Sequence, residues 1–277
     1  MTNKTWFIAG ASRGLGRVWA EAALQRGDRV AVTARRADDI AELASRYGEA
    51  VEPIVFDVTD RAAVFAAFDA AIRRFGAIDV VVANAGYGLF GAVEEASEAE
   101  SRAQFDTNLF GTLWVVQAAL PHLRSRRGGH ILATSSLAGV ITFPTAGVYN
   151  ATKWAVEGLL QTLAAEVAEF GIKVTLVEPG GYATDWRGAS SSQSQPLAAY
   201  DGLRERLRAM SAGRALADPA ATAGTILQLV DAETPPLRLF LGAANLELAR
   251  REYAARLETW QAWQEAARAA QGDAAQA

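Results

Sequence analysis

Three side chains near the middle of the sequence combine a phenol, an amine and a hydroxyl. Tyr149 and Lys153 stand four residues apart, and Ser136 precedes the tyrosine by thirteen residues. If Val148–Phe170 is helical, as its apolar pattern predicts, positions i and i+4 share one face. A phenol has a pKa of about 10, and a neighbouring ammonium lowers that pKa because it favours the phenolate. Such a pair is suited to exchange a proton with an oxygen whose carbon gains or loses a hydride.

The elements that must position these groups follow from the alternation of short apolar runs and longer helical patterns. This alternation predicts an α/β fold, with a parallel sheet covered by helices on both faces. The expected strands are Thr5–Ala9, Arg29–Thr33, Val51–Phe56, Ile78–Ala83, His130–Thr134, Lys173–Glu178 and Leu237–Leu241. The expected helices are Leu15–Arg26, Asp38–Tyr47, Arg61–Phe75, Glu98–Arg124, Val148–Phe170 and Pro219–Val230. We therefore predict one doubly wound, Rossmann-like domain of about seven strands over residues 1–242.

Two segments depart from this rhythm. Ala189–Gln195 is rich in Ser and Gln and is predicted to be a mobile lid. It leads to Leu203–Met210, a polar segment that is predicted to be helical. Residues 243–277 are predicted to form a helical extension with a frayed, Ala- and Gln-rich tail. The apolar stripe of that helix either packs on its own domain or contacts another subunit, and it consists of Leu246, Tyr253, Leu257 and Trp260.

Composition excludes several classes of protein. The 277 residues carry a formal net charge of −4, which gives no basic surface for nucleic acid or an anionic membrane. The absence of cysteine rules out disulfides, thiolate nucleophiles and thiolate metal sites, and two histidines are too few for a His-rich metal site. We expect no metal. No secretory signal and no run of about 20 apolar residues is visible, so a cytoplasmic protein is predicted.

A glycine-rich loop follows the first predicted strand and opens into the first predicted helix. Gly10, Gly14 and Gly16 allow a tight turn and a close backbone approach to a pyrophosphate, which the helix N-terminus then stabilises. Their position between a strand and a helix of a βαβ pattern indicates a dinucleotide site.

The end of the second strand indicates which dinucleotide is bound. An NAD site usually places an acid there for the ribose hydroxyls, but this chain has Ala34 followed by Arg35. Arg13 in the glycine loop is expected to face the same region. Two guanidinium groups are suited to hold a 2′-phosphate through forked, charge-assisted hydrogen bonds, so NADP(H) is the predicted cofactor.

With these motifs in order, residues 5–242 resemble the compact, single-domain branch of the short-chain dehydrogenase/reductase family. Ala9 departs from the threonine that usually precedes the first glycine, which removes a hydroxyl, and Ala83 departs from the first asparagine of the Asn-Asn-Ala-Gly turn. The resemblance implies that the cofactor is held by Gly10, Ser12, Arg13, Gly14, Leu15, Gly16, Arg35, Asp57, Val58, Asn84, Ala85, Gly86, Tyr149, Lys153, Pro179, Gly180 and Thr184.

The resemblance also implies a catalytic tetrad of Asn108, Ser136, Tyr149 and Lys153. Ser136, and not Ser135, has the family spacing to the tyrosine. In this reading Asn108 orders a water in a proton relay, Ser136 polarises the substrate oxygen and Tyr149 donates or removes the proton. Lys153 lowers the pKa of the tyrosine and binds the nicotinamide ribose.

The segments expected to line the substrate pocket are mainly apolar and aromatic, which suits a small hydrophobic carbonyl or alcohol. The candidates are Tyr87, Phe90, Phe143, Tyr182 and Trp186. We predict an NADP-dependent oxidoreductase that interconverts a hydrophobic ketone or aldehyde and its alcohol. Two alternatives stay open: a ketoreductase on β-keto acyl thioesters and a non-catalytic NADPH-binding sensor. Family analogy predicts a homo-oligomer, a dimer or tetramer, packed through Glu98–Arg124 and Val148–Phe170.

Overall fold

Seven parallel strands form the central sheet of the computed structural model, which describes residues 3–188, 190–213 and 215–271. The sheet order is β3-β2-β1-β4-β6-β7-β9, and every neighbouring pair is parallel. The strands are β1 (Thr5–Ala9), β2 (Arg29–Ala34), β3 (Val51–Val55), β4 (Val80–Ala83), β6 (Gly129–Thr134), β7 (Ile172–Pro179) and β9 (Arg238–Leu241). The predicted doubly wound fold is confirmed.

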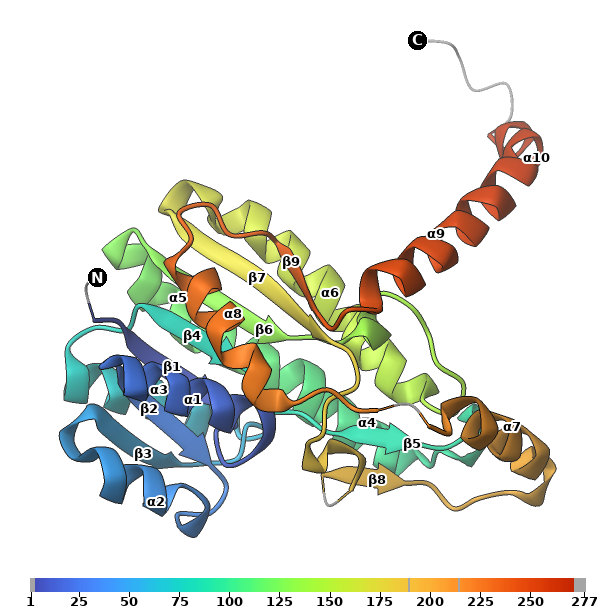
Figure 1. Cartoon of the computed structure of the whole chain (residues 1–277). Coiled ribbons are helices and arrows are strands. Elements are labelled where there is room, and N and C mark those ends of the chain that lie inside the picture. The colour runs from blue at the N-terminus through green and yellow to red at the C-terminus, as the bar shows by residue number, and fades with distance from the viewer. Residues whose placement is uncertain (1–2, 189, 214, 272–277) are drawn as a thin grey trace.

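Helices cover both faces of this sheet (Figure 1). On one face lie α1 (Gly14–Arg26), α2 (Asp38–Tyr47) and α8 (Thr222–Asp231), and on the other lie α3 (Arg61–Phe75), α5 (Gly111–Arg126) and α6 (Gly147–Val167). Along β1, Trp6 and Ile8 enter the core under α1 and α8, whereas Phe7 and Ala9 enter the core under α3, α5 and α6. Both faces of the strand are buried, which explains its continuous apolar sequence.

The predicted helix Glu98–Arg124 is interrupted. The structure divides it into α4 (Glu98–Phe105), a π-helical turn (Asp106–Phe110) and α5. Most other predicted boundaries agree within two residues, and the last turn of Val148–Phe170 tightens into a 3₁₀ helix at Ala168–Phe170. The π-helical turn matters for function because it carries Asn108.

A second, two-stranded parallel sheet was not predicted. It pairs β5 (Gly88–Phe90) with β8 (Ser191–Gln193), and α7 (Asp201–Ser211) follows. The predicted lid therefore contains β8, while its first residue, Ala189, lies outside the described residues. Its mobility stays a prediction.

A buried ion pair connects the segment that contains β8 and α7 with Glu95, which precedes α4. Arg204 of α7 donates to Glu95 at 2.6 Å, and the same carboxylate accepts hydrogen bonds from the backbone N–H groups of Leu197 and Ala92 at 2.7 Å each. These three hydrogen bonds lower the pKa of Glu95 to about 2, with the Leu197 bond contributing most. The carboxylate thus stays ionised at neutral pH.

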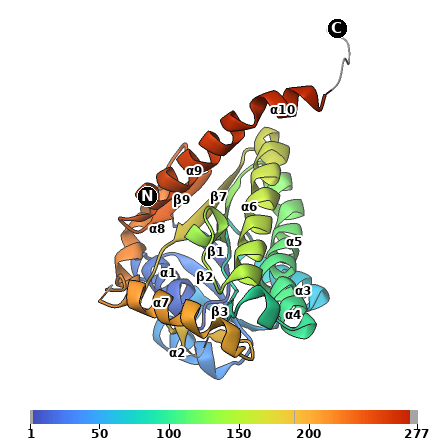
Figure 2. The ribbon, with the colours of Figure 1, turned by 90° about the vertical axis from the view of Figure 1, so that its right-hand side faces the viewer.

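The C-terminal helices α9 (Asn245–Ala262) and α10 (Gln264–Ala269) project from the body of the molecule (Figures 1 and 2). α9 packs on the domain at two places: Ala249 is buried in a cluster with Leu137, and the Arg256 guanidinium lies 4.7 Å from the centroid of the Trp154 ring of α6. The residues of the predicted apolar stripe do not take part in this packing: each side chain is between 43% and 61% exposed, for Leu246, Tyr253, Leu257 and Trp260. Residues 272–277 of the predicted tail lie outside the described part, and the domain boundary after residue 242 stays a prediction.

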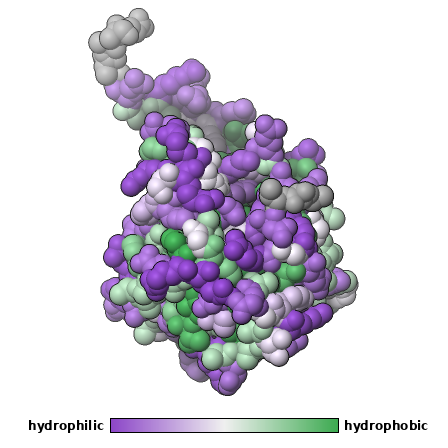
Figure 3. Space-filling model, turned by 90° about the vertical axis from the view of Figure 1, so that its left-hand side faces the viewer, coloured by the Kyte–Doolittle hydropathy of each residue, from purple (hydrophilic) through white to green (hydrophobic). Residues whose placement is uncertain are grey.

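The side of the molecule that carries β3 and α2 presents a mixed surface of hydrophilic and hydrophobic residues (Figure 3). No helix in residues 3–188, 190–213 and 215–271 is long and apolar enough to span a membrane.

Candidate active site

The glycine loop joins β1 to α1 in a conformation that only glycine adopts easily. Gly10 has φ +83°, and a Cβ there would lie 2.8 Å from the Ala85 Cα. A Cβ at Gly16 would lie 2.2 Å from the Gly10 carbonyl oxygen and 2.4 Å from Nδ2 of Asn84. The loop is thus packed against the turn after β4, and its glycines keep that contact possible.

Side chains from neighbouring strands hold this loop in place. Asn84 Nδ2 donates to the Gly10 carbonyl at 2.7 Å, and the Thr134 hydroxyl donates to Asn84 Oδ1 at 3.0 Å. The Gly10 N–H donates to the Thr33 hydroxyl at 3.1 Å. Thr33 of β2 thus provides a hydroxyl beside the loop, where Ala9 lacks one. Nothing in the sequence around Thr33 indicates this contact, because only the pairing of β1 with β2 brings the hydroxyl to the loop.

The start of α1 fits a phosphate group. The first turn has no acidic residue, and Arg13 at the N-cap makes no side-chain capping hydrogen bond. The first amide groups of the helix are therefore available to an anion, at its positive end. Near this turn, Gly14, Thr184 and Leu216 help to line a hollow of about 570 Å³. These features fit the pyrophosphate of a dinucleotide.

The remaining predicted cofactor residues lie at the carboxyl ends of the strands. Arg13 and Arg35 are exposed, and Ala34, which replaces the acid, is buried. Asp57 accepts hydrogen bonds from the Thr59 N–H and hydroxyl at 2.9 Å each. The other predicted cofactor residues lie at the end of a strand or in the segment that follows it, and they are Ser12, Leu15, Val58, Ala85, Gly86, Pro179 and Gly180.

Tyr149 and Lys153 lie on the first turns of α6, and both are 5% exposed. Lys153 Nζ donates to the Thr134 carbonyl at 2.7 Å and lies 5.8 Å from the centroid of the Tyr149 ring. Ser136 caps the 3₁₀ helix Leu137–Gly139, where its hydroxyl accepts from the Ala138 N–H at 3.1 Å, and the same hydroxyl acts on the Tyr149 phenol to lower its pKa. Phenol, amine and hydroxyl are thus brought together where β6 ends.

Asn108 is fully buried beside this group, on the π-helical turn. Its Nδ2 donates to the Tyr87 carbonyl at 3.0 Å and to the Thr152 hydroxyl at 3.1 Å, and its Oδ1 accepts from the Tyr87 N–H at 3.0 Å. These bonds connect α6 with the turn after β4. Nothing in residues 106–110, which contain neither glycine nor proline, predicts the extra residue in this turn.

Burial sets the ionisation of the site. It raises the pKa of Tyr149 to about 12, partly offset by the hydrogen bond with Ser136. Burial also lowers the pKa of Lys153 to about 8, partly offset by the charge of Glu157. The shift of the tyrosine is opposite to the predicted one because the cost of placing a phenolate in this buried position dominates.

Two of the five predicted substrate residues, Trp186 and Phe90, pack against the cluster that contains Tyr149. The Trp186 ring centroid lies 5.0 Å from that of Tyr149 and 5.2 Å from that of Phe90. Tyr87 adjoins the site through its backbone bonds to Asn108.

Phe143 and Tyr182 are placed differently. The Phe143 side chain is 41% exposed, whereas Tyr182 packs on the core cluster under α1 and α8. The structure therefore does not bring these two side chains into the cluster around Tyr149.

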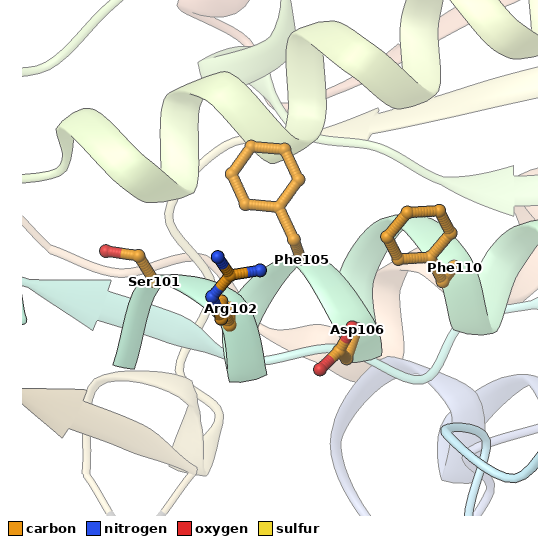
Figure 4. A pocket seen from close by; sticks show the side chains of 5 residues that line it. All are labelled: Ser101, Arg102, Phe105, Asp106 and Phe110. Atoms are coloured by element: carbon orange, nitrogen blue, oxygen red, sulfur yellow. The ribbon is translucent and has the colours of Figure 1, made fainter. Parts of the chain in front are cut away.

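A smaller hollow of about 340 Å³ lies away from this cluster, on α4 and the π-helical turn (Figure 4). Phe105 points from it toward α6, and Phe110 stacks on Trp114 with ring centroids 5.9 Å apart. Asn108 belongs to the same turn, but no tetrad side chain lines this hollow.

Relatives and solved structures agree with this architecture. Oxidoreductase BOA17 of Botryotinia fuckeliana is 43% identical over 250 residues, which cover 89% of this chain and 91% of the relative. A 3-ketodihydrosphingosine reductase of Bacteroides thetaiotaomicron is 36% identical over 239 residues, covering 85% and 86%. The crystal structure of a short-chain dehydrogenase from Streptomyces avermitilis superposes with a TM-score of 0.90 and 36% identity, covering 97% of this chain and 98% of that one.

Solved neighbours contain either dinucleotide. An alcohol dehydrogenase from Thermococcus sibiricus, with 5-hydroxy-NADP, gives a TM-score of 0.73 at 28% identity, covering 87% of this chain and 96% of that one. A short-chain dehydrogenase/reductase from Burkholderia phymatum, with NAD, gives 0.79 at 25% identity, covering 92% and 95%. The family model described as short chain dehydrogenase matches residues 4–195. The chain therefore belongs to the short-chain dehydrogenase family of oxidoreductases.

Proposed function

We propose that this chain is an NADP-dependent oxidoreductase that interconverts a hydrophobic ketone or aldehyde and its alcohol. The observation that carries the proposal is the buried group of Tyr149, Lys153 and Ser136, next to the dinucleotide loop. The bound dinucleotide would supply the hydride in reduction and accept it in oxidation.

The side chains have distinct parts in the proposed reaction. In reduction, the Ser136 hydroxyl donates a hydrogen bond to the carbonyl oxygen, and the Tyr149 hydroxyl transfers its proton to that oxygen. The raised pKa of Tyr149 keeps the phenol protonated at neutral pH, as a proton donor requires. The Lys153 ammonium then stabilises the phenolate. In oxidation, the phenolate takes the proton from the alcohol. Asn108 holds α6 in register with the turn after β4.

The preference for NADP rests on the end of β2. Ala34 offers no carboxylate to the ribose hydroxyls, and Arg35 directly follows it in an exposed position. Arg13, also exposed, belongs to the glycine loop next to β2. Two arginines in this region support recognition of a 2′-phosphate.

The apolar substrate class rests on the rings around Tyr149. The Trp186 ring lies against the phenol and Phe90 lies against Trp186, so that both offer aromatic surface to a substrate near Tyr149. The name of the Bacteroides thetaiotaomicron relative, 3-ketodihydrosphingosine reductase, supports a ketone with a large apolar part.

The test is oxidation of NADPH by the purified protein with aromatic ketones, aldehydes, long-chain ketones and β-keto thioesters. We expect turnover with NADPH to exceed turnover with NADH. Tyr149→Phe should lower kcat by about 100- to 10,000-fold, the usual contribution of a positioned acid, and leave NADPH affinity nearly unchanged. Tyr253→Phe, which alters a 43% exposed tyrosine on α9, is the matched control.

Each result of this test separates the proposal from an alternative. If Tyr149→Phe retained most of the activity, the tyrosine would not be the proton donor. Turnover confined to β-keto thioesters would favour the ketoreductase, and tight NADPH binding without turnover on any class would favour the sensor.

A further inference from the structure

A cluster of buried polar side chains lies behind Lys153. Glu157 stands one turn further along α6, Glu178 lies near the end of β7, and Ser135 follows β6. These three residues are between 0% and 5% exposed. Arg238 enters the cluster from β9. None of these residues was singled out in the sequence as part of the site.

The cluster contains more hydrogen-bond acceptors than donors. Arg238 Nε lies 2.9 Å from Glu157 Oε2 and 3.5 Å from Glu178 Oε1, and the arginine also donates to Gln161 at 2.8 Å. Within the described residues, Glu157 Oε1, both Glu178 carboxylate oxygens and Ser135 Oγ have no hydrogen-bond partner. Arg238 donates to only one of the four carboxylate oxygens, so two fully ionised carboxylates would leave three buried oxygens without a donor.

A proton on the pair resolves this imbalance. Both carboxylates lie against the same Arg238 Nε, at 2.9 and 3.5 Å, and two neighbouring carboxylates form a hydrogen bond with each other only when one of them carries the hydrogen. Burial and the neighbouring charge of Glu157 raise the pKa of Glu178 to about 8, although Arg238 opposes the shift. The pair thus carries one negative charge at neutral pH.

The negative charge of the pair affects the tetrad by acting on Lys153. The negative charge of Glu157 raises the pKa of Lys153 against the effect of burial. The packing between them is tight, since a Cβ added at Gly139 would lie 2.7 Å from Ser135 Oγ, 3.0 Å from Glu157 Cγ and 3.1 Å from the Lys153 carbonyl. From α9, Asn245 donates to the backbone carbonyl of Glu178 at 3.2 Å. The charged groups that face the pair are Arg238, which lies against both carboxylates, and Lys153, whose pKa is raised by the charge of Glu157.

We propose that Glu157 and Glu178 share one proton behind the tetrad, and that the single negative charge left on the pair keeps Lys153 in its ammonium form. The two carboxyl groups touch no reacting atom and act through Lys153. The effect on Lys153 rests on the proposed function, whereas the shared proton does not.

The shared proton is tested on the whole protein by infrared spectroscopy at pH 7 in D₂O. We expect the carbonyl stretch of a protonated carboxylic acid, lost in Glu178→Gln and retained in Glu166→Gln, which alters an exposed glutamate on the same helix. A wild-type spectrum without this band would overturn the proposal, because both carboxyl groups would then be ionised.

Thermal unfolding gives a second measurement of the same proton. A carboxyl whose pKa is raised by folding binds its proton more tightly in the folded chain, so its contribution to stability is present at low pH and lost as pH rises from about 4.5 to about 8. The Tm of the wild type should therefore fall relative to that of Glu178→Gln across this window. An unchanged difference between the two Tm values would contradict the raised proton affinity.

The effect on Lys153 is tested by the pH profile of kcat/KM in the reductive direction. Glu157→Gln removes the carboxyl group nearest to Lys153 along α6, so the alkaline decline should begin about one pH unit lower than in Glu166→Gln. Superimposable profiles would refute this role. If no carbonyl substrate is turned over, the proposed function fails, while the infrared and unfolding measurements still decide whether the proton is shared.

Discussion

The two ends of the site are built differently. At the cofactor end, backbone groups of the glycine loop approach the turn after β4 so closely that a single added carbon would collide, and the loop is held by a hydrogen bond donated by Asn84 and one accepted by Thr33. At the substrate end, Tyr149 is covered by the rings of Trp186 and Phe90, which come from separate segments joined by the small β5–β8 sheet.

This difference predicts different tolerances. The closest contacts at the cofactor end are made by the backbone, so a change that pushes the glycine loop away from the turn after β4 should weaken binding of any dinucleotide. Rings at the substrate end can be exchanged one at a time without moving the sheet, so a change there should alter the choice of substrate. Loss of cofactor binding and loss of substrate preference should therefore be separable by mutation.

The largest effect is expected from Gly16→Ala. The new Cβ would fall 2.2 Å from the Gly10 carbonyl oxygen, and backbone must move to admit it. We expect NADPH and NADH both to bind at least ~100-fold more weakly, at the upper end of the usual cost of overpacking. Fluorescence titration of each dinucleotide measures this change.

Gly158→Ala is the control for this prediction. Gly158 lies on α6 with open space where a Cβ would be, and alanine favours the helix by about 1 kcal/mol. This variant should bind both dinucleotides normally. Normal binding by Gly16→Ala as well would show that the loop is not closed as tightly as the contacts indicate.

A smaller, substrate-dependent effect is expected from Trp186→Ala. Without the indole, Tyr149 loses the ring at 5.0 Å and becomes more accessible to water, so its pKa should fall from about 12. We expect kcat/KM for an apolar ketone to fall about 10- to 100-fold, because the aromatic contacts and the apolar area both contribute to binding. NADPH affinity should remain unchanged.

Steady-state kinetics with ketones of increasing apolar size, and ultraviolet titration of the tyrosine, measure these effects. Trp260→Ala removes a ring of the same size from a 61% exposed position on α9 and should change neither. If Trp186→Ala lost NADPH binding instead, the prediction that cofactor binding and substrate preference can be separated by mutation would be wrong.

The sheet was predictable because each of its strands is an apolar run between helical patterns. β5 and β8 were not, because each has three residues, and the pairing joins Gly88–Phe90 to Ser191–Gln193 across about a hundred residues of chain. The polar sequence of β8 is typical of a loop and does not predict a strand. Only the pairing in the folded chain shows that this segment reaches the substrate end.

In the site as well, some features could be predicted from the sequence and others depend on contacts that form only in the folded chain. Spacing singled out the glycines and the pair of Tyr149 and Lys153, since these depend on a local turn and on one helix face, whereas Asn108 was predicted from the family resemblance. The raised pKa of Tyr149 depends on how deeply the ring is buried, and no spacing within α6 shows this. Thr33 and Glu178 were missed for a related reason, because each acts across the sheet and not along the chain.

The smallest effect is expected from Arg35→Ala, which tests whether a side chain also contributes at the cofactor end. A charge-assisted hydrogen bond contributes about 1.5–3 kcal/mol, and the lower value suits an exposed arginine, so NADPH binding should weaken about 10-fold, while NADH binding, which involves no 2′-phosphate, should hardly change. Arg36→Ala is the matched control, since Arg36 lies 3.6 Å from Asp38 and is already paired. An equal loss of both dinucleotides in Arg35→Ala would refute the 2′-phosphate contact. A loss confined to NADPH would mean that backbone closure at this end binds the dinucleotide and that one exposed arginine selects which dinucleotide is bound.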